Sequence, residues 1–296
     1  MPDSGVLAEC VINLSEGRNE PVIDALRNAG ATTVLDVHSD PEHNRTVLTL
    51  GGSLDIVEEA VRQVVATAVA LIDLRTHSGI HPRFGAADVV PFVPLGESKG
   101  IEDPWLHVIE ARDRFARWAG ADLALPCFLY GPERSLPEVR RSAFRLLEPD
   151  AGPRAPHPTA GASAVGARPV LVAYNVWITG TPHRPDELPS VVTVARSLAG
   201  GLRSPTVRSL GLATETGAQV SFNLIDPKAT SVADLYDAVA VGAESQGCSV
   251  LRGELVGLLP NDALRATPRR RWAELDLGES KSIESRLATR GYPGFP

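Results

Sequence analysis

The order of the apolar patterns is the feature that most restricts the fold of this chain, because one order occurs twice. In the first half, apolar runs typical of strands alternate with 3.6-residue patterns typical of helices. The order is β-α-β-β-α-β, with strands expected at 6–14, 32–37, 46–51 and 88–95 and helices at 20–29 and 53–71. Gly30 follows the first helical pattern as a stop signal, and Ser53 can cap the second.

The second half repeats this order, with strands expected at 169–178, 207–213, 218–225 and 249–259 and helices at 186–198 and 231–247. A Thr216-Gly217 turn indicates a hairpin between its two middle strands. Such units form ferredoxin-like α/β layers, in which helices cover one face of a mostly antiparallel sheet. Because each sheet leaves one face bare, we expect two subdomains, 1–168 and 169–296, whose mixed or antiparallel sheets face each other across a ligand channel.

Between the two units the pattern changes. A helix is expected at 104–119, a short strand at 126–130 and another helix at 137–146, followed by a stretch rich in Pro and Gly at 149–161. Composition alone favours an interdomain linker for this stretch. A ligand-binding loop is the alternative, because the small residues that follow it would let the backbone approach a ligand closely.

Charge and cysteine content exclude several classes of function. The chain has 29 basic and 36 acidic residues, a formal net charge of −7, so it has no general attraction for nucleic acid or an anionic membrane. Its apolar runs are shorter than the ~20 residues that cross a bilayer, and its N-terminus shows no signal peptide. Cys10, Cys127 and Cys248 have no metal-ligand or disulfide spacing. We therefore expect a cytoplasmic protein that binds neither nucleic acid nor a membrane and has no metal.

The densest cluster of chemically active side chains is the predicted loop 75–88, which contains two histidines and two arginines among Gly and Pro. A histidine can exchange protons near neutral pH, and Pro82 restricts the backbone of His81 before it. His77 and His81 have the i,i+4 spacing of a helical metal pair, but Gly79 and Pro82 argue against a helix, and no third ligand is evident. An ordinary solvent-exposed loop histidine remains the other alternative.

Two further segments are candidates for an anion site. The turn 15–18 follows the first strand, and the polar corner 38–45 lies between the second and third strands. Either segment could be an ordinary connection, but Arg45 at the start of a strand can bind a carboxylate with two hydrogen bonds. Dinucleotide fingerprints, P-loops, serine nucleophile elbows and zinc signatures do not occur in the sequence.

Six blocks of the sequence, in order, resemble the formiminotransferase family. They are ECVINLSEG at 9–17, NRTV at 44–47, GIHPRFGAADVVPF at 79–92, GASAVGAR at 161–168, QVSFNL at 219–224 and ELVGLLP at 254–260. The resemblance covers roughly residues 7–265. The sequence is similar to the transferase part of the family alone, without the cyclodeaminase domain of the bifunctional members.

The resemblance implies a homodimer that binds tetrahydrofolate as co-substrate in the channel between the two sheets, with His81 as the catalytic acid and base. It places the folate-binding segment at 152–161, in which the cofactor-binding candidates are Gly152, Pro153, His157, Pro158 and Gly161. This favours the ligand-loop interpretation over the linker. The mammalian members have aromatic residues where this chain has Pro156 and Ala160.

The remaining substrate-binding candidates follow from the expected reaction, transfer of the formimino group of N-formimino-L-glutamate to tetrahydrofolate. Arg45, Arg83 and Arg168 are candidates for the carboxylates of the two substrates. Asp88 either orients His81 or caps a strand, and His38 stands where the mammalian members have an aspartate. The alternatives are a formyl or formimino transferase with another donor or acceptor and a folate-binding protein without activity.

Overall fold

The structure is a computed structural model that describes residues 5–80, 83–96, 103–180 and 188–292. The chain divides into two compact units. Unit 1 comprises Met1–Pro169 with Leu287–Pro296, and unit 2 comprises Val170–Arg286. Within the described ranges, no helix is long and apolar enough to span a membrane.

Unit 1 is built on a six-stranded sheet with the order β2-β3-β1-β4-β6-β5. Its strands are β1 Leu7–Leu14, β2 Val34–Asp40, β3 Arg45–Ser53, β4 Ala87–Pro94, β5 Cys127–Tyr130 and β6 Ser163–Ala167. The first four strands pair antiparallel, in the order of a ferredoxin-like β-α-β-β-α-β unit. β6 extends the sheet by pairing parallel with both β4 and β5.

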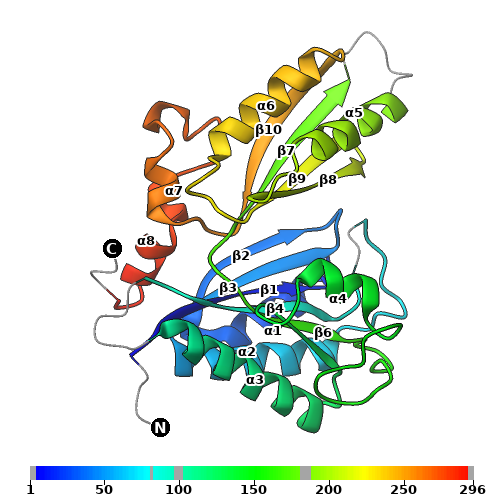
Figure 1. Cartoon of the computed structure of the whole chain (residues 1–296), viewed down its shortest axis with the longest axis vertical. Coiled ribbons are helices and arrows are strands. Elements are labelled where there is room, and N and C mark those ends of the chain that lie inside the picture. The colour runs from blue at the N-terminus through cyan, green and yellow to red at the C-terminus, as the bar shows by residue number, and fades with distance from the viewer. Residues whose placement is uncertain (1–4, 81–82, 97–102, 181–187, 293–296) are drawn as a thin grey trace. The chain divides into compact units, whose positions relative to one another are not determined.

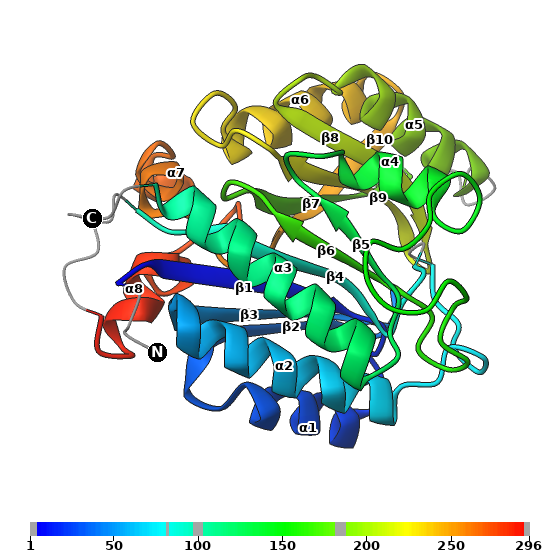
Figure 2. The ribbon, with the colours of Figure 1, turned by 60° about the horizontal axis from the view of Figure 1, so that its bottom comes forward.

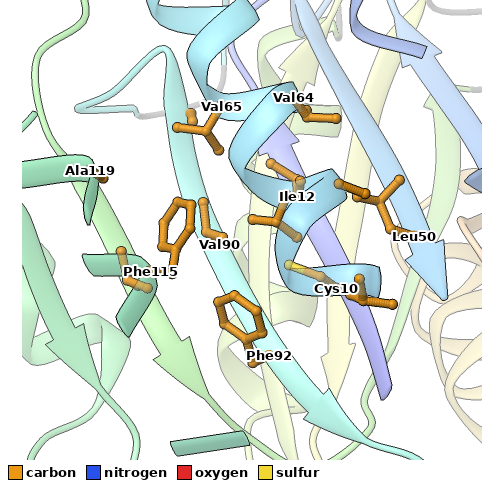
Figure 3. Packing of buried hydrophobic residues seen from close by; sticks show 14 of the residues in the cluster. Cys10, Ile12, Leu50, Val64, Val65, Val90, Phe92, Phe115 and Ala119 are labelled. Carbon is orange, nitrogen blue, oxygen red and sulfur yellow. The ribbon is translucent and has the colours of Figure 1, made fainter. Parts of the chain in front are cut away.

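Three helices cover one face of this sheet: α1 Glu20–Gly30, α2 Leu54–Leu71 and α3 Pro104–Asp122 (Figures 1 and 2). The alternation of β1 directs Cys10 and Ile12 toward these helices, where they pack with Leu50 and Phe92 of the neighbouring strands (Figure 3). This fully buried core fixes the register of the sheet, because a shift by one residue would expose every one of these side chains.

The opposite face of the sheet has two different regions. The fourth helix, α4 Leu136–Ser142, covers β5 and β6, where Val139 packs with Phe128 and Tyr130. Over β1 to β3, the register directs polar side chains to this same face: Glu9, Asn13, Asp36, His38, Asp40, Arg45 and Thr49. These polar side chains lie on the face opposite α1, α2 and α3.

The strand β6 was missed by the sequence patterns, which treated 162–168 as small residues of a possible binding loop. These residues are small because β6 lies buried between two strands. A side chain at Gly166 would come within 2.1 Å of the Tyr130 ring. The helix predicted at 137–146 also ends earlier, at Ser142, and Phe144 adopts a left-handed backbone with φ of 58°.

We predict that Gly166→Ala lowers the free energy of unfolding by about 1–3 kcal/mol, because overpacking a buried site forces neighbouring groups apart. Urea unfolding measures the change. Gly200→Ala is the control, because a side chain there meets no atom within 4 Å and lies in a helix. It should leave stability unchanged or raise it by up to about 1 kcal/mol. Equal effects of both substitutions would contradict the close packing of β6.

Unit 2 repeats the β-α-β-β-α-β order on a four-stranded sheet with the order β10-β7-β9-β8. Its elements are β7 Val172–Gly180, α5 Leu188–Gly201, β8 Val207–Thr214, β9 Gly217–Leu224, α6 Val232–Glu244 and β10 Cys248–Val256. Helices α5 and α6 pack on one face of this sheet. The three shorter elements α7 Asn261–Arg265, η3 Arg269–Arg271 and η4 Glu279–Lys281 follow before α8 Ile283–Ala288.

The predicted α/β class with two β-α-β-β-α-β units is thus confirmed, including the β8–β9 hairpin. That the two sheets face each other across a channel stays a prediction. The last described residues return to unit 1, where the Tyr292 hydroxyl accepts a hydrogen bond from the amide of Ser53 at 3.2 Å and Arg290 donates to the carbonyl of Val34 at 2.7 Å.

Candidate functional site

Three connecting segments of unit 1 meet at one end of its sheet. They are the turn 15–19 after β1, the β2–β3 corner 40–45 and the loop 73–86 before β4. Gly17 lies so close to the corner that a side chain there would come within 2.3 Å of the Asp40 carbonyl. Ser15 binds the loop through its amide, to Ala86 at 2.8 Å, and its hydroxyl, to Gly85 at 2.7 Å. The sequence candidates for an anion site therefore adjoin the histidine-rich loop.

The corner 40–45 is held rigid by Asp40 and Asn44. The Asp40 carboxylate contacts Nδ1 of the buried His43 at 2.5 Å and accepts the amides of Glu42 and His43. Although burial raises the pKa of Asp40, these hydrogen bonds lower it to about 2. Asn44 takes the left-handed backbone, with φ of 48°, that asparagine tolerates well.

Asn44 joins the corner to both neighbouring segments. Its Oδ1 accepts the amide of Gly17 at 2.9 Å, and its Nδ2 donates to the carbonyl of Ser78 at 2.9 Å. The backbone of the corner contacts the loop as well, because a side chain at Gly79 would come within 2.4 Å of the His43 carbonyl. The corner thus holds the described part of the loop in place through hydrogen bonds and close packing.

The predicted catalytic residue, His81, and Pro82 lie outside the described residues, but both sides of the loop are described. His77 and Arg83 are half-buried and contact each other, and Nη2 of Arg83 donates to the His43 carbonyl at 3.2 Å. Arg75, in contrast, is exposed and pairs with Asp73 beside it in the sequence. The role of His81 stays a prediction.

Asp88 lies at a bulge between Ala87 and Val89, where the pairing of β4 with β1 shifts register. A bulge redirects a side chain, and the Asp88 carboxylate accepts the amide of Phe84 at 2.8 Å and the Arg140 guanidinium of α4 at 2.5 Å. With 4% of its surface exposed, Asp88 ties the end of the loop to α4. Its predicted contact with His81 remains untested.

Arg45 is the cation of this cluster with the least compensation. Its Nε atom is buried and has no hydrogen-bond partner among the described residues. Burial lowers the pKa of Arg45 to about 10, the Asp88 and Asp40 charges raise it, and Arg140 and Arg83 lower it. A buried guanidinium among other guanidinium groups is an arrangement that a bound carboxylate would stabilise.

The other two candidates on this sheet lie in different places. His38 on β2 shares the polar face with Asn13, since both residues pair with Val47 of β3. Arg168 follows β6 at the opposite end of the sheet, where its amide donates to the Phe92 carbonyl and its Nη1 donates to the Pro169 carbonyl at 2.8 Å. On β4, the neighbour of Arg168 in register is Val93. This residue lies four positions beyond Val89, which is about 13 Å along the strand. Arg168 therefore belongs to a separate cationic position from Arg45 and Arg83.

The segment 152–161 is part of unit 1, and its interpretation as an interdomain linker is wrong. The unit boundary falls at Pro169 and Val170. Thr159 and Ala160 accept hydrogen bonds from the amides of Leu74 and Ala86 in the loop 73–86. The segment thus lies beside the histidine-rich loop, as a binding segment would.

Within this segment the folate candidates divide into turn-forming and exposed residues. His157 accepts the amide of Ala160 through Nδ1 at 3.0 Å, so its ring holds the turn together. Gly161 packs against the Phe84 carbonyl with φ of 68°. Gly152, Pro153 and Pro158 are exposed. Their part in folate binding stays a prediction.

Unit 2 also carries an ordered polar cluster on the sheet face opposite its helices. Glu254 of β10 accepts hydrogen bonds from the Trp177 indole at 2.9 Å and the Asn175 amide at 3.0 Å, both on β7. The Arg252 guanidinium lies 4.4 Å from the centre of the Trp177 ring. The sequence patterns gave no signal for this cluster, because its residues come together only through the pairing of two strands far apart in the chain.

The geometry defines a two-unit α/β protein with a cationic, histidine-containing site at the end of one sheet, suited to a carboxylate ligand. Residues 7–168 match the family model of the formiminotransferase domain, N-terminal subdomain, and residues 173–274 match that of the formiminotransferase domain. The chain is 36% identical over 277 residues to the glutamate formimidoyltransferase of Streptococcus pyogenes, covering 87% of this chain and 90% of the relative.

Two further relatives extend the comparison. The glutamate formimidoyltransferase of Thermoplasma acidophilum is 35% identical over 279 residues, 87% of this chain and 89% of the relative. The formimidoyltransferase-cyclodeaminase of Rattus norvegicus is 34% identical over 283 residues, which are 87% of this chain but 51% of that longer protein. This chain belongs to the formiminotransferase family.

Proposed function

We propose that this protein is a formimidoyltransferase that transfers the formimino group of N-formimino-L-glutamate to tetrahydrofolate, giving 5-formiminotetrahydrofolate and glutamate. The observation that carries the proposal is the match of both units to formiminotransferase models, with relatives named glutamate formimidoyltransferase aligned over 87% of the chain. The reaction would belong to histidine breakdown and one-carbon metabolism, in a cytoplasmic homodimer.

In the proposed reaction, N5 of tetrahydrofolate attacks the formimino carbon of the donor. The attacking nitrogen must lose a proton and the departing glutamate nitrogen must gain one. His81 would accept the first proton and donate the second, which contributes ~10²–10⁴-fold to the rate. Holding both substrates in one site adds a further contribution through proximity.

The described residues support binding of the two substrates at opposite ends of the sheet. Arg45 and Arg83 lie in the cluster that adjoins the His81 loop, so they would bind a carboxylate of formiminoglutamate near the reacting carbon. Arg168, at the opposite end of the sheet, would bind a carboxylate of the other substrate. His38 and Asn13 lie on the same polar face of the sheet, both in register with Val47 of β3, and would contact the substrates.

A direct assay tests this proposal. The purified chain is incubated with tetrahydrofolate and formiminoglutamate, and 5-formiminotetrahydrofolate is detected by mass spectrometry. N-formylglutamate, N-formiminoaspartate and N-formiminoglycine serve as alternative donors. A product formed only with one of these alternative donors would show that the donor substrate is not formiminoglutamate. Calorimetric binding of tetrahydrofolate without any product would indicate an inactive folate-binding protein.

We also predict that saturating tetrahydrofolate slows amide hydrogen exchange in 152–161. Several of these residues are exposed although the segment adjoins the loop before β4, so a bound ligand would protect them. Hydrogen exchange with mass spectrometry measures the effect, and the exposed turn 226–230 of unit 2 is the control, which should not change. Unchanged exchange in 152–161 at saturation would remove this segment from the folate site.

A further inference from the structure

Three buried polar atoms on the sheet of unit 1 have no hydrogen-bond partner among the described residues. They are Oδ1 of Asn13 on β1 and, on β3, Nε of Arg45 and Oγ1 of Thr49. Thr49 has 1% of its surface exposed. Polar atoms away from water are nearly always paired in native proteins, because an unpaired one loses the hydrogen bonds that it makes in water. These three atoms are therefore candidates for contacts with a ligand.

The strand register groups the three atoms around Val47. Asn13 pairs with Val47, which lies between Arg45 and Thr49 on the same face of β3, whereas Leu48 points to the apolar core. Asn13 is thus a diagonal neighbour of both polar residues, at a spacing of about 7–8 Å. Arg45 and Thr49 are about 13 Å apart along the strand. One small ligand lying along β3 could therefore contact all three.

The side-chain amide of Asn13 has a defined orientation. Its Nδ2 atom donates to the Val11 carbonyl at 3.3 Å, and a carbonyl oxygen only accepts hydrogen bonds. The opposite orientation would place two acceptors against each other, so Oδ1 is the unpaired atom. This atom requires an N–H or O–H group of a ligand. Arg45, in contrast, requires an acceptor for its Nε–H, and the hydroxyl of Thr49 can either donate or accept.

The donor substrate of the proposed reaction carries groups of both kinds. N-formimino-L-glutamate has two carboxylates, which accept hydrogen bonds, and two methylene groups that can pack on Val47. Its formimino group is an amidine, which is protonated at neutral pH, so its nitrogens donate. N-formyl-L-glutamate has the same carbon skeleton and the same carboxylates, but an oxygen replaces the terminal nitrogen. The two compounds therefore differ in whether this one atom donates or accepts.

We propose that Asn13 is a specificity-determining residue, whose Oδ1 accepts a hydrogen bond from the terminal formimino nitrogen of the donor. In the same arrangement Arg45 binds one carboxylate and the Thr49 hydroxyl donates to the other. This inference rests on the proposed function, because it names the group of the proposed substrate that Asn13 recognises. A formyl oxygen in the same place would face Oδ1 with lone pairs on both atoms, which leaves both unpaired.

Calorimetry of the purified chain with N-formimino-L-glutamate and N-formyl-L-glutamate measures both dissociation constants without turnover. The wild type should bind the formimino compound at least ~10²-fold more tightly, since a site that pairs with a ligand N–H strongly rejects the analogue that lacks it. Asn13→Leu and Asn13→Ala should both reduce this preference by at least ~10-fold, the equivalent of losing a hydrogen bond to a charged group. Asn13→Asp keeps an acceptor at this position and should retain the preference.

Two further variants separate recognition of the formimino group from general loss of binding. Thr49→Val is the matched comparison, because both compounds carry the carboxylate that Thr49 binds. It should weaken both by about 10-fold and leave the ratio of the two dissociation constants unchanged. Asn28→Leu, at an exposed position of α1, is the control and should change neither constant.

These measurements distinguish failure of the inference from failure of the proposed function. If the preference exists and Asn13→Leu removes it, but no 5-formiminotetrahydrofolate forms, the proposed reaction is wrong and Asn13 still selects the ligand. Equal affinity of the wild type for the two compounds, or binding of neither, would overturn the role of Asn13. The same holds if Asn13→Leu and Asn13→Ala keep the full preference or weaken both compounds equally.

Discussion

Replacing His81 by Ala is expected to lower kcat for formimino transfer by at least ~10²-fold, because a positioned acid and base contributes this much or more to the rate. The KM values of both substrates should change far less, since proton transfer is needed in the transition state and not for binding. Steady-state kinetics with formiminoglutamate and tetrahydrofolate measure both quantities. Should His81→Ala keep near-full turnover, the proposed mechanism is wrong.

Matched histidine variants separate this effect from general damage to the loop. His107→Ala on α3 should keep full activity, and His77→Ala should be milder than His81→Ala because it removes a contact of the loop and not the proton carrier. Thermal unfolding of His77→Ala and His107→Ala should give similar midpoints, as neither residue lies in the apolar core, and the midpoint of His81→Ala is compared with these two. A large fall in the midpoint for His81→Ala would assign its loss of activity to folding.

The repeated β-α-β-β-α-β order could be predicted from sequence because its elements have clean periodicities and two of its helices have side-chain caps, although Ser53 at the start of α2 makes no cap hydrogen bond. Asn19 accepts the amide of Val22 at the start of α1, and Ser231 forms a capping box with Asp234 at the start of α6. The strand β6 could not be predicted, since its residues are small and lie buried between β4 and β5. Such a run lacks the alternation that marks a strand with one exposed face.

The candidate site shows the same division between local and distant information. Arg45 and Arg83 could be selected because they stand in polar segments beside strands and in blocks that resemble a known family. Arg140 carries no signal of its own, and only the fold shows that it contacts Asp88 and that Asn44 contacts Ser78. The Asp40–His43 pair is close in sequence. An acidic and a basic residue often occur in the same turn without contact, so the sequence alone does not predict this pair.

The unequal pairing of two arginines, the half-buried Arg45 and the buried Arg112, gives the second large effect. Arg112 has 1% of its surface exposed and binds Glu133 with two hydrogen bonds of 2.7 Å, as well as the Tyr130 carbonyl. Arg45 has a buried Nε without any partner among the described residues. Replacing an arginine whose buried Nε makes no hydrogen bond by an apolar side chain removes the cost of desolvating that group, whereas removing one partner of a buried pair is destabilising. The two arginines should therefore respond oppositely to the same substitution.

Arg45→Met should raise the KM for formiminoglutamate by about 10- to 100-fold, the equivalent of losing hydrogen bonds to a charged group, and should leave the thermal midpoint unchanged or higher. Arg45→Lys should recover part of the affinity, since an ammonium keeps the charge without the two-pronged geometry. Arg112→Met, the control, should leave KM unchanged and lower the free energy of unfolding by at least about 1 kcal/mol. Steady-state kinetics and urea unfolding of these three variants measure the KM and the free energy of unfolding. If Arg45→Met loses stability as Arg112→Met does while KM stays the same, Arg45 supports the fold and the carboxylate must be bound elsewhere.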